Sequence, residues 1–342
     1  MMLVGIVLLL AGAEALVRGS VALAGRAGVP PLIVGLTLVS IGTSAPEVMV
    51  TGIAAVEGSP GVAMGNVVGS NIFNILGILG IAALFGALHV SRAVIRRDIP
   101  LLMAVSLLVL GLAGSGVVAR GEGLLLLVLA FVYTLHLAGA ALREDVPPIK
   151  PAGGGVLREL FMAVGGIAAL AVGAHWLVRG AVDLAGVLAV PEHLVGVTIV
   201  AAGTSLPELA TTVAAARRGE GDLAVGNIVG SNLYNLLLVL GAGAMLSPTG
   251  LPVEPSAITF DLPLMLVAAF ALLPFAATGF RIDRWEGVVF LVHFVAYVGV
   301  LVASALGHAV PDLLFLIFLV PLTVITIGIV GIRVRNKVRS SE

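Results

Sequence analysis

Eleven apolar runs, each long enough for one membrane-crossing helix, constrain the fold of this chain more than any other feature. A helix needs about 20 apolar residues to cross the hydrocarbon core of a bilayer. The runs cover roughly residues 2–26, 31–56, 61–86, 99–118, 122–142, 159–187, 193–216, 222–246, 260–279, 286–306 and 311–332. The sequence therefore predicts an all-α polytopic membrane protein of about eleven transmembrane helices, with no room for a soluble domain.

Composition excludes several classes of protein. Charged residues make up only 11% of the 342 residues, whereas a soluble domain carries about 25%. A soluble globular enzyme is therefore excluded. A net charge of −1 leaves no basic face for nucleic acid. Cysteine is absent, so the chain has neither a thiolate metal site nor a Cys nucleophile. We expect no enzyme activity, no resident cofactor and no obligate protein partner; the predicted partner is the lipid bilayer.

The basic residues predict the orientation of the helices. With the N-terminus outside, the loops and tail that fall inside hold nearly every Lys and Arg, and the outer loops hold only Arg120. Inner loops of membrane proteins are enriched in these residues. The inner set is Arg26, Arg92, Arg96, Arg97, Arg143, Lys150, Arg158, Arg217, Arg218, Arg281, Arg284 and the tail residues Arg333, Arg335, Lys337 and Arg339. We therefore predict a multi-pass protein of the cell (inner) membrane, with its N-terminus out and its C-terminus in.

The sequence repeats itself after 161 residues, the interval from Glu47 to Glu208. The segment LVRG occurs at 16–19 and 177–180, GTSAPE at 42–47 matches GTSLPE at 203–208, and GNVVGSNIFN at 65–74 matches GNIVGSNLYN at 226–235. The predicted organisation is a first repeat at 1–143, a cytoplasmic linker at 144–158, a second repeat at 159–307, and an extra helix with a basic tail at 310–342.

Each repeat holds five predicted helices, so the second starts on the opposite side of the membrane from the first. Inverted repeats of this kind are typical of secondary transporters, which use the two related halves for alternating access. A duplication that merely built a helical bundle is the alternative. The best-matched residues are polar, however, and this favours the transporter.

Polar residues inside the predicted second, third, seventh and eighth helices indicate an ion site. Glu47 and Glu208 lie deep in their helices, where a carboxylate is costly and usually marks an ion pathway. Pro46 and Pro207 should break these helices. A capping box, with Ser44 or Ser205 as the cap, is the structural alternative for each glutamate. Oxygen ligands with two carboxylates suit Na⁺ or Ca²⁺. The asparagines of the third and eighth helices add amide oxygens, or else bond the helices to one another.

These two motifs, each present twice, resemble the alpha repeats of the cation/calcium antiporter superfamily, and most closely those of prokaryotic sodium/calcium exchangers. The resemblance covers ten of the eleven predicted helices. It implies exchange of Ca²⁺ for Na⁺ at four adjacent ion sites in the core. The metal ligands that it implies, completed by the equivalent residues of the other repeat, are Glu47, Glu208, Asn74, Asn235, Thr43, Ser44, Thr204, Ser205, Ser231 and Ser70, with carbonyl oxygens from Ser40 and Ala201.

Asn235 departs from the family pattern, because many sodium/calcium exchangers have Asp at this position. Two carboxylates balance one Ca²⁺, whereas three Na⁺ would leave an excess positive charge in a site of low dielectric constant. H⁺, Li⁺ and K⁺ therefore stay open as coupling ions, and a cation channel is the alternative from a different class.

Two further sets of charged residues lie within predicted helices. Glu14 and Arg18 are four residues apart and are expected to form an ion pair. His175, Arg179 and Asp183 are expected to interact in the same way on the predicted sixth helix. Structural roles are the simplest interpretation of both sets.

Overall fold

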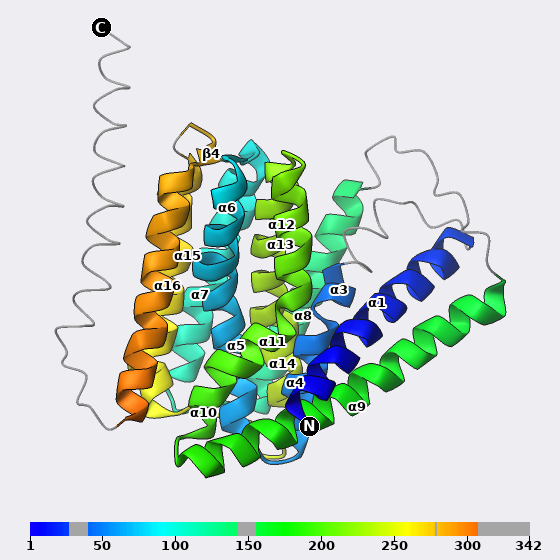
Figure 1. The fold of residues 1–342 in the computed structure, drawn as a ribbon, viewed down its shortest axis with the longest axis vertical. Helices are drawn as coiled ribbons and strands as arrows, with labels where there is room; N and C mark the ends of the chain where they lie inside the picture. Colours follow the sequence, from blue (N-terminus) through cyan, green and yellow to red (C-terminus); the bar gives the residue numbers. More distant parts are fainter. Residues whose placement is uncertain (27–39, 142–154, 278, 307–342) are drawn as a thin grey trace, which may run out of the picture. The chain divides into compact units, whose positions relative to one another are not determined.

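Two compact units make up the part of the chain that the computed structural model describes, which is residues 1–26, 40–141, 155–277 and 279–306 (Figure 1). Unit 1 is formed by residues 1–67, 117–207 and 233–253, and unit 2 by residues 68–116, 208–232 and the residues from 254 onward. Each unit thus takes segments from both sequence repeats.

Unit 1 is helical, with one small sheet. Its helices are α1 (Met2–Arg26), α3 (Ser40–Thr43), α4 (Ala45–Val56), α8 (Arg120–Ala141), α9 (Val156–Leu188), α10 (Glu192–Val195), the π-helix η4 (Gly196–Val200), α11 (Ala201–Thr204), the π-helix η5 (Asn235–Val239) and α14 (Leu240–Leu246). Its two strands are β2 (Val117–Val118) and β3 (Leu251–Pro252). It also holds the first turns of α5 (Pro60–Ile72) and the last residues of α13 (Gly221–Tyr234).

Unit 2 is also helical, with one small sheet. It contains the last residues of α5 and most of α12 (Leu206–Arg217) and α13, together with η2 (Phe73–Leu79), α6 (Gly80–Phe85), η3 (Val94–Asp98), α7 (Ile99–Ala113), η6 (Ala257–Asp261), α15 (Leu262–Ala277) and α16 (Arg284–Ala305). Its strands are β1 (Leu88–His89) and β4 (Arg281–Ile282). The elements η2, η3 and η6 are π-helical turns inside otherwise continuous helices.

Seven helices in the described residues are long and apolar enough to cross a membrane, and an eighth span results if the helices on either side of Ser205 count as one. The multi-pass prediction is therefore confirmed. The count of eleven stays a prediction, because the eleventh helix (311–332), the linker and the start of the second helix fall wholly or largely outside the described residues. The two spans that carry the asparagine motifs, Pro60–Phe85 and Gly221–Leu246, are the most buried, at 83% and 72%.

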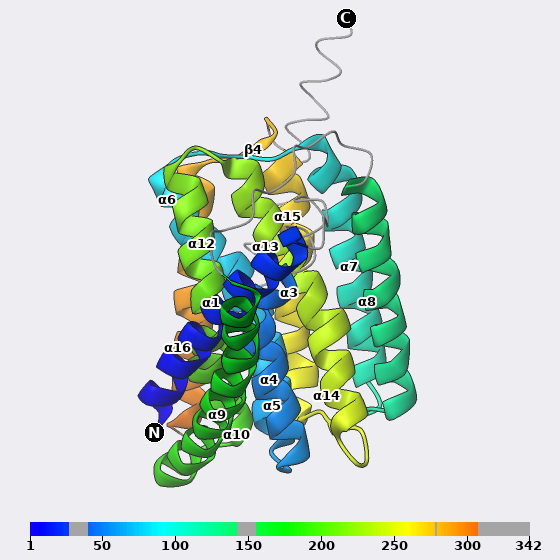
Figure 2. The same cartoon turned by 90° about the vertical axis from the view of Figure 1, so that its right-hand side faces the viewer.

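Glycines bring α1 and α9 of unit 1 into backbone contact. The two helices lie side by side in both views (Figures 1 and 2). A β-carbon added to Gly5 would lie 2.8 Å from the carbonyl oxygen of Gly173, and one added to Gly12 would lie 2.8 Å from that of Gly166. The contacts run in opposite order along the two helices, so α1 and α9 are antiparallel. Small residues at a fixed spacing allow such close packing in membranes.

The two repeats make equivalent contacts in the two units. In unit 1, α8 packs on α14, and a β-carbon at Gly123 would lie 2.9 Å from the carbonyl oxygen of Gly241. In unit 2, α16 packs on α6, and a β-carbon at Gly287 would lie 2.9 Å from that of Gly80. Gly80 and Gly241 are 161 residues apart. Each unit therefore joins one helix from each repeat through the same pair of glycine positions.

The small sheets join loops that the basic residues place on the same side of the membrane. In unit 2, β1 pairs antiparallel with β4, from two predicted inner loops. In unit 1, β2 pairs antiparallel with β3, from two predicted outer loops. Both pairings agree with the predicted alternation of the helices. The orientation itself, N-terminus out and C-terminus in, stays a prediction.

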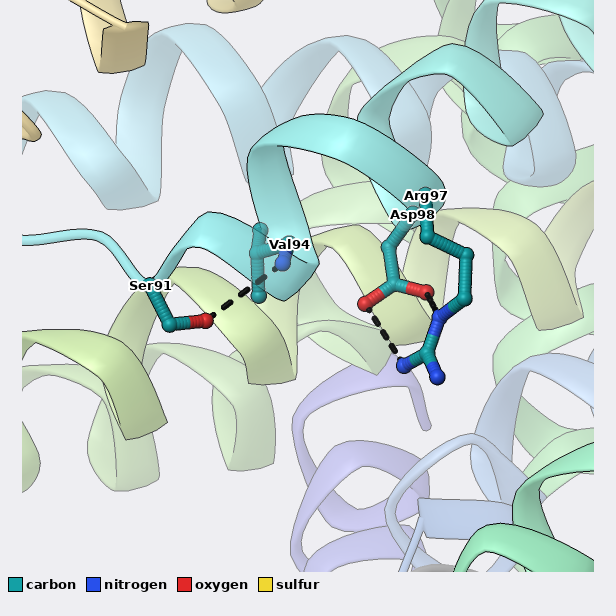
Figure 3. Close-up of polar contacts among 4 residues, drawn as sticks. All are labelled: Ser91, Val94, Arg97 and Asp98. Carbon is teal, nitrogen blue, oxygen red and sulfur yellow. Dashed lines mark hydrogen bonds and ion pairs between the residues drawn. The ribbon is translucent and has the colours of Figure 1, made fainter.

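Charged residues in the predicted inner loops also have local structural roles. The side chain of Arg97 binds Asp98 through two hydrogen bonds, Nε to Oδ1 at 2.6 Å and Nη2 to Oδ2 at 3.1 Å (Figure 3). Nearby, the hydroxyl oxygen of Ser91 accepts a hydrogen bond from the backbone N–H of Val94 at 3.4 Å (Figure 3). This hydrogen bond satisfies a donor at the helix start, where no carbonyl is available.

The packing of α1 on α9 predicts different effects for two neighbouring glycines. A β-carbon at Gly166 would lie 2.6 Å from the backbone nitrogen of Leu16 and 2.7 Å from the carbonyl oxygen of Gly12, whereas one at Gly165 has nothing within 4 Å. We expect Gly166→Ala to lower the free energy of unfolding by about 1–3 kcal/mol, the usual cost of overpacking. Gly165→Ala should leave stability unchanged or raise it slightly, because Ala favours helices. Thermal unfolding in detergent tests this, and equal melting temperatures would contradict it.

Candidate ion site

Two helices break immediately before the turns that carry Glu47 and Glu208. Ser44 separates α3 from α4 with φ −83° and ψ 4°, and Ser205 separates α11 from α12 with φ −84° and ψ 12°. Pro46 and Pro207 follow two residues later and lack the N–H that would continue the helical hydrogen bonds. The predicted breaks are confirmed. Broken helices inside a membrane are tolerated where they line a cavity or lie buried in protein.

The capping box does not explain Ser44. Its side chain makes no capping hydrogen bond, and its hydroxyl oxygen is buried with no hydrogen-bond partner among the described residues. A complete capping box does occur elsewhere in the chain, between Asp283 and Glu286 at the start of α16. The hydroxyl of Ser44 therefore has a different role from that of a helix cap.

The Glu47 cluster lies in unit 1. Glu47 is 1% exposed, and its Oε1 accepts a hydrogen bond from the hydroxyl of Ser205 at 3.0 Å. Its Oε2 is buried and has no partner among the described residues, and no described Lys, Arg or His forms an ion pair with it. A buried carboxylate without a counter-charge is costly. A bound cation would remove this cost. Thr43, another predicted ligand, is also buried in this unit.

Asn66 holds three segments of the Glu47 cluster together. Its amide nitrogen donates to the hydroxyl of Thr51 at 3.0 Å and to the carbonyl oxygen of Glu47 at 3.4 Å. Its amide oxygen accepts from the hydroxyl of Thr204 at 2.9 Å. Asn66 is fully buried. Asn66 is not among the predicted ligands, although it is the first Asn of the repeated GN motif, which is the sequence signal that marks it. Asn66 is a positioning residue, because all three bonds connect protein groups.

The carbonyl oxygen of Ala201, a predicted ligand, already accepts two hydrogen bonds. The hydroxyl of Thr204 donates to it at 3.2 Å, and the backbone N–H of Ser205 donates at 3.1 Å. The hydroxyl hydrogen of Thr204 can serve only Asn66 or Ala201 at one time. Ser40, the equivalent residue of the first repeat, lies in α3, and its side chain is outside the described residues. Both carbonyl ligands stay predictions.

The Glu208 cluster lies in unit 2. Glu208 is 1% exposed, and its Oε1 accepts a hydrogen bond from the hydroxyl of Ser231 at 3.4 Å. Asn227, the repeat equivalent of Asn66, donates to the hydroxyls of Thr211 and Thr212 at 3.1 and 3.0 Å. Thr211 in turn donates to the carbonyl oxygen of Glu208 at 3.1 Å. The second glutamate is therefore held by hydroxyl and amide groups of its own repeat.

The asparagines of unit 2 bond its helices to one another. The amide nitrogen of Asn74 donates to the amide oxygen of Asn232 at 2.9 Å, and the amide nitrogen of Asn232 donates to the carbonyl oxygen of Asn71 at 3.2 Å. The interhelical role is thus confirmed for these nitrogens. It leaves the amide oxygen of Asn74 buried without a partner among the described residues. One side chain can therefore pack helices through its nitrogen and offer its oxygen to a cation.

Several oxygens of the predicted ligands are left without a hydrogen bond, like the amide oxygen of Asn74. Each is buried and has no hydrogen-bond partner among the described residues, and a polar atom in that condition usually has a ligand or water to satisfy it. In unit 1 these oxygens are Glu47 Oε2, Ser44 Oγ and Asn235 Oδ1. In unit 2 they are Asn74 Oδ1 and Ser70 Oγ. All are hard oxygen donors of the type that Na⁺ and Ca²⁺ prefer.

Neutral oxygens outnumber the charged ones in these clusters. Within the described residues, no three Asp, Glu, His or Cys side chains gather into a metal-binding group. Each unit contributes a single glutamate among hydroxyls and amides. The expectation that Glu47 and Glu208 share one ion site stays a prediction, because they belong to different units.

Comparison with known proteins identifies the family of the chain that carries these clusters. The family model described as "Sodium/calcium exchanger protein" matches residues 1–139 and 159–303. The inner membrane protein YrbG of Escherichia coli K12 is 38% identical over 286 residues, covering 80% of this chain and 87% of its own length. The sodium/calcium exchanger MaX1 of Methanosarcina acetivorans is 34% identical over 341 residues, covering 88% of this chain and 97% of its own length.

The solved structures give the same result. The sodium-calcium exchanger NCX_Mj, in crystals soaked with Na⁺ and Sr²⁺, matches with a TM-score of 0.61 and 30% identity. The match covers 85% of this chain and 94% of that structure. Both segments of the family match contain one glutamate motif and one asparagine motif. The chain therefore belongs to the sodium/calcium exchanger protein family, whose members are multi-pass membrane exchangers.

Proposed function

We propose that this chain is a secondary active antiporter that exchanges Ca²⁺ for Na⁺ across the membrane by alternating access, with Glu47 and Glu208 as the two acidic ion ligands. One observation carries the proposal. Each glutamate lies at a helix break, is 1% exposed and accepts a hydrogen bond from a serine. Buried carboxylates of this kind mark ion pathways in membrane proteins. The family and the named exchangers that the chain resembles support the same conclusion.

Charge explains why the two ions would take turns. Two carboxylates balance one Ca²⁺, or two Na⁺ in overlapping positions. Both cargoes together would leave a large uncompensated positive charge in a medium of low dielectric constant, which is costly. Binding of one ion would therefore require release of the other, and the Na⁺ gradient would drive Ca²⁺ outward.

The relation between the repeats supports alternating access. The helices α1 and α9 are repeat equivalents that pack antiparallel through the glycines of the two repeats. Equivalent helices that run in opposite directions are what inverted repeats require. Two halves related in this way can exchange conformations, so that one state opens inward and the other outward.

Neutralising either glutamate should abolish exchange. An ion pair at about 4 Å contributes about 4 kcal/mol at an effective dielectric constant of 20, which is about a thousandfold in affinity. We expect Glu47→Gln and Glu208→Gln to reduce uptake of radioactive Ca²⁺ into Na⁺-loaded vesicles to the background of empty vesicles. Glu220→Gln is the matched control, because Glu220 is exposed in a loop. Undiminished uptake by either buried variant would refute its role as a ligand.

Asn66 and Asn227 occupy equivalent positions and should differ in their effect on stability. Removal of the Asn66 amide leaves the hydroxyls of Thr51 and Thr204 without their buried partner, so we expect Asn66→Ala to lower the free energy of unfolding by about 1–3 kcal/mol. Asn227 is part-exposed, and water can replace its bonds, so Asn227→Ala should cost less. Thermal unfolding of both variants measures this difference. The reverse order of stability would show that Asn66 does not organise its cluster.

Asn235 favours a second candidate function, which is Ca²⁺ antiport coupled to a monovalent ion other than Na⁺. It carries no charge where many family members have Asp, and its buried Oδ1 has no hydrogen-bond partner among the described residues. Another monovalent ion could therefore replace Na⁺ as the coupling ion. Ca²⁺ flux driven in turn by gradients of Na⁺, Li⁺, K⁺ and H⁺ identifies that ion. Flux that follows voltage alone, without any counter-ion, would instead indicate a cation channel.

Restoring the missing charge should favour the monovalent cargo. Asn235→Asp adds a third carboxylate, which can balance a third Na⁺. We expect this variant to reach half-maximal exchange at a lower Na⁺ concentration than the natural chain. The Na⁺ dependence of Ca²⁺ uptake at fixed Ca²⁺ measures the shift, with Asn235→Ala as the uncharged control. An unchanged or higher half-saturating Na⁺ concentration in Asn235→Asp would place Asn235 outside the ion site.

A further inference from the structure

An open groove of about 340 Å³ lies on the surface of unit 1, along α4. This volume is within the range of small-molecule sites, roughly 300–1,000 Å³. Its apolar wall is formed by Val48, Met49, Gly52, Ile53 and Val56 of α4 and by Leu246 of α14. Gly52 keeps the groove open, because a β-carbon there would come within 3.2 Å of the Leu246 side chain. We call this feature the α4 groove.

The α4 groove is separate from the candidate ion site. Successive helical residues turn by 100°, so Val48, Gly52 and Val56 form one stripe along α4, with Met49 and Ile53 beside it. Glu47 and Thr51 lie on the opposite side of the helix and are buried, at 1% and 0% exposed. The helix α4 therefore presents its ion ligand to the interior and the groove to the periphery of its unit.

One end of the α4 groove carries charged groups: Glu57 and His175 line it, and Arg179 lies beside Glu57 next to the groove. Glu57 caps α4 at its C-terminus, and its Oε1 lies 2.5 Å from Nδ1 of His175. Its Oε2 lies 3.8 Å from Nε of Arg179. The side chains of Glu57, His175 and Arg179 are 26%, 42% and 63% exposed, so an arriving ligand can reach all three. The spacing of His175 and Arg179 predicts an interaction along their own helix, but in the structure both have Glu57, at the end of α4, as their acidic partner.

We propose that the α4 groove binds one molecule of phosphatidylethanolamine. One of its two acyl chains lies along the apolar wall. The primary ammonium of the headgroup binds the Glu57 carboxylate in place of His175, and the phosphate binds the Arg179 guanidinium. The groove thus matches a molecule that carries a cation, an anion and a long apolar chain. The proposal concerns a peripheral lipid and does not depend on the transported ion.

The headgroup must provide the selectivity for this lipid. An acyl chain gains little by moving from the bilayer into the groove, because lipid tails are as apolar as the groove wall. Phosphatidylglycerol offers a phosphate but no cation for Glu57. Phosphatidylcholine offers a cation without an N–H donor, so it cannot donate a hydrogen bond to the carboxylate. Phosphatidylethanolamine satisfies both charges and supplies the donors.

Native mass spectrometry of the full chain in detergent, with equal amounts of the three phospholipids, tests the proposal. We expect the natural chain to retain phosphatidylethanolamine in preference to the other two. Glu57→Gln and Arg179→Gln should each lower this retention about tenfold, the effect of one hydrogen bond to a charged group. Gly52→Leu, which fills the groove, should lower it independently of charge.

Arg18→Gln is the matched control. Arg18 is the repeat equivalent of Arg179, and its side chain is 69% exposed beside Glu14 on α1, outside the groove. It should retain the lipid like the natural chain. Melting temperatures show which variants are folded, and the comparison uses those that are. Equal retention of the three lipids by the natural chain would overturn the proposal, and so would retention by folded Glu57→Gln or Gly52→Leu equal to that of Arg18→Gln.

Discussion

A carboxylate shielded from water, for which the described residues provide no basic partner, is the constraint on which the rest of this structure depends. Glu47 accepts one hydrogen bond from Ser205, and its second oxygen has no partner among the described residues. At 1% exposure Glu47 has almost no contact with water, and a carboxylate buried without a counter-charge is costly. Under the proposed function, a bound cation would remove that cost. The helix break, the hydroxyls and the amide oxygens around it would suit this role, because each offers a neutral oxygen without adding a charge.

Close helix packing holds these costly groups in place. Glycines let α1 contact α9 through their backbones, and the equivalent glycines Gly123 and Gly287 repeat this contact type once in each unit. Asn66, Asn74 and Asn232 then connect helices through hydrogen bonds whose geometry side-chain volume alone would not specify. Glycine therefore lets helix backbones approach, and asparagine connects helices through its side-chain amide. In Asn74 the amide oxygen is left without a partner among the described residues.

The helix α4 separates two environments along its length. Glu47 and Thr51 face the buried interior of unit 1, while Val48, Gly52 and Val56 face the α4 groove. Each side of the helix carries one glutamate. Glu57, at the groove, is paired with His175 and Arg179, whereas the described residues offer Glu47, on the buried side, no basic partner. Two glutamates of one helix thus have different chemistry, because one meets the surface and the other meets only neutral groups.

The sequence by itself determined the membrane class, the repeat, the helix breaks at Ser44 and Ser205 and the ion pair of Glu14 with Arg18. These follow from local rules: apolar length, the missing N–H of proline and the spacing of charges along one helix. Only the tertiary structure decided which buried oxygens accept hydrogen bonds and which have no partner among the described residues. It also decided that Asn66 joins three segments and that Glu57 is the partner of His175. Such pairings join residues up to 161 positions apart, and a sequence pattern does not specify which of many polar side chains will meet once the helices pack.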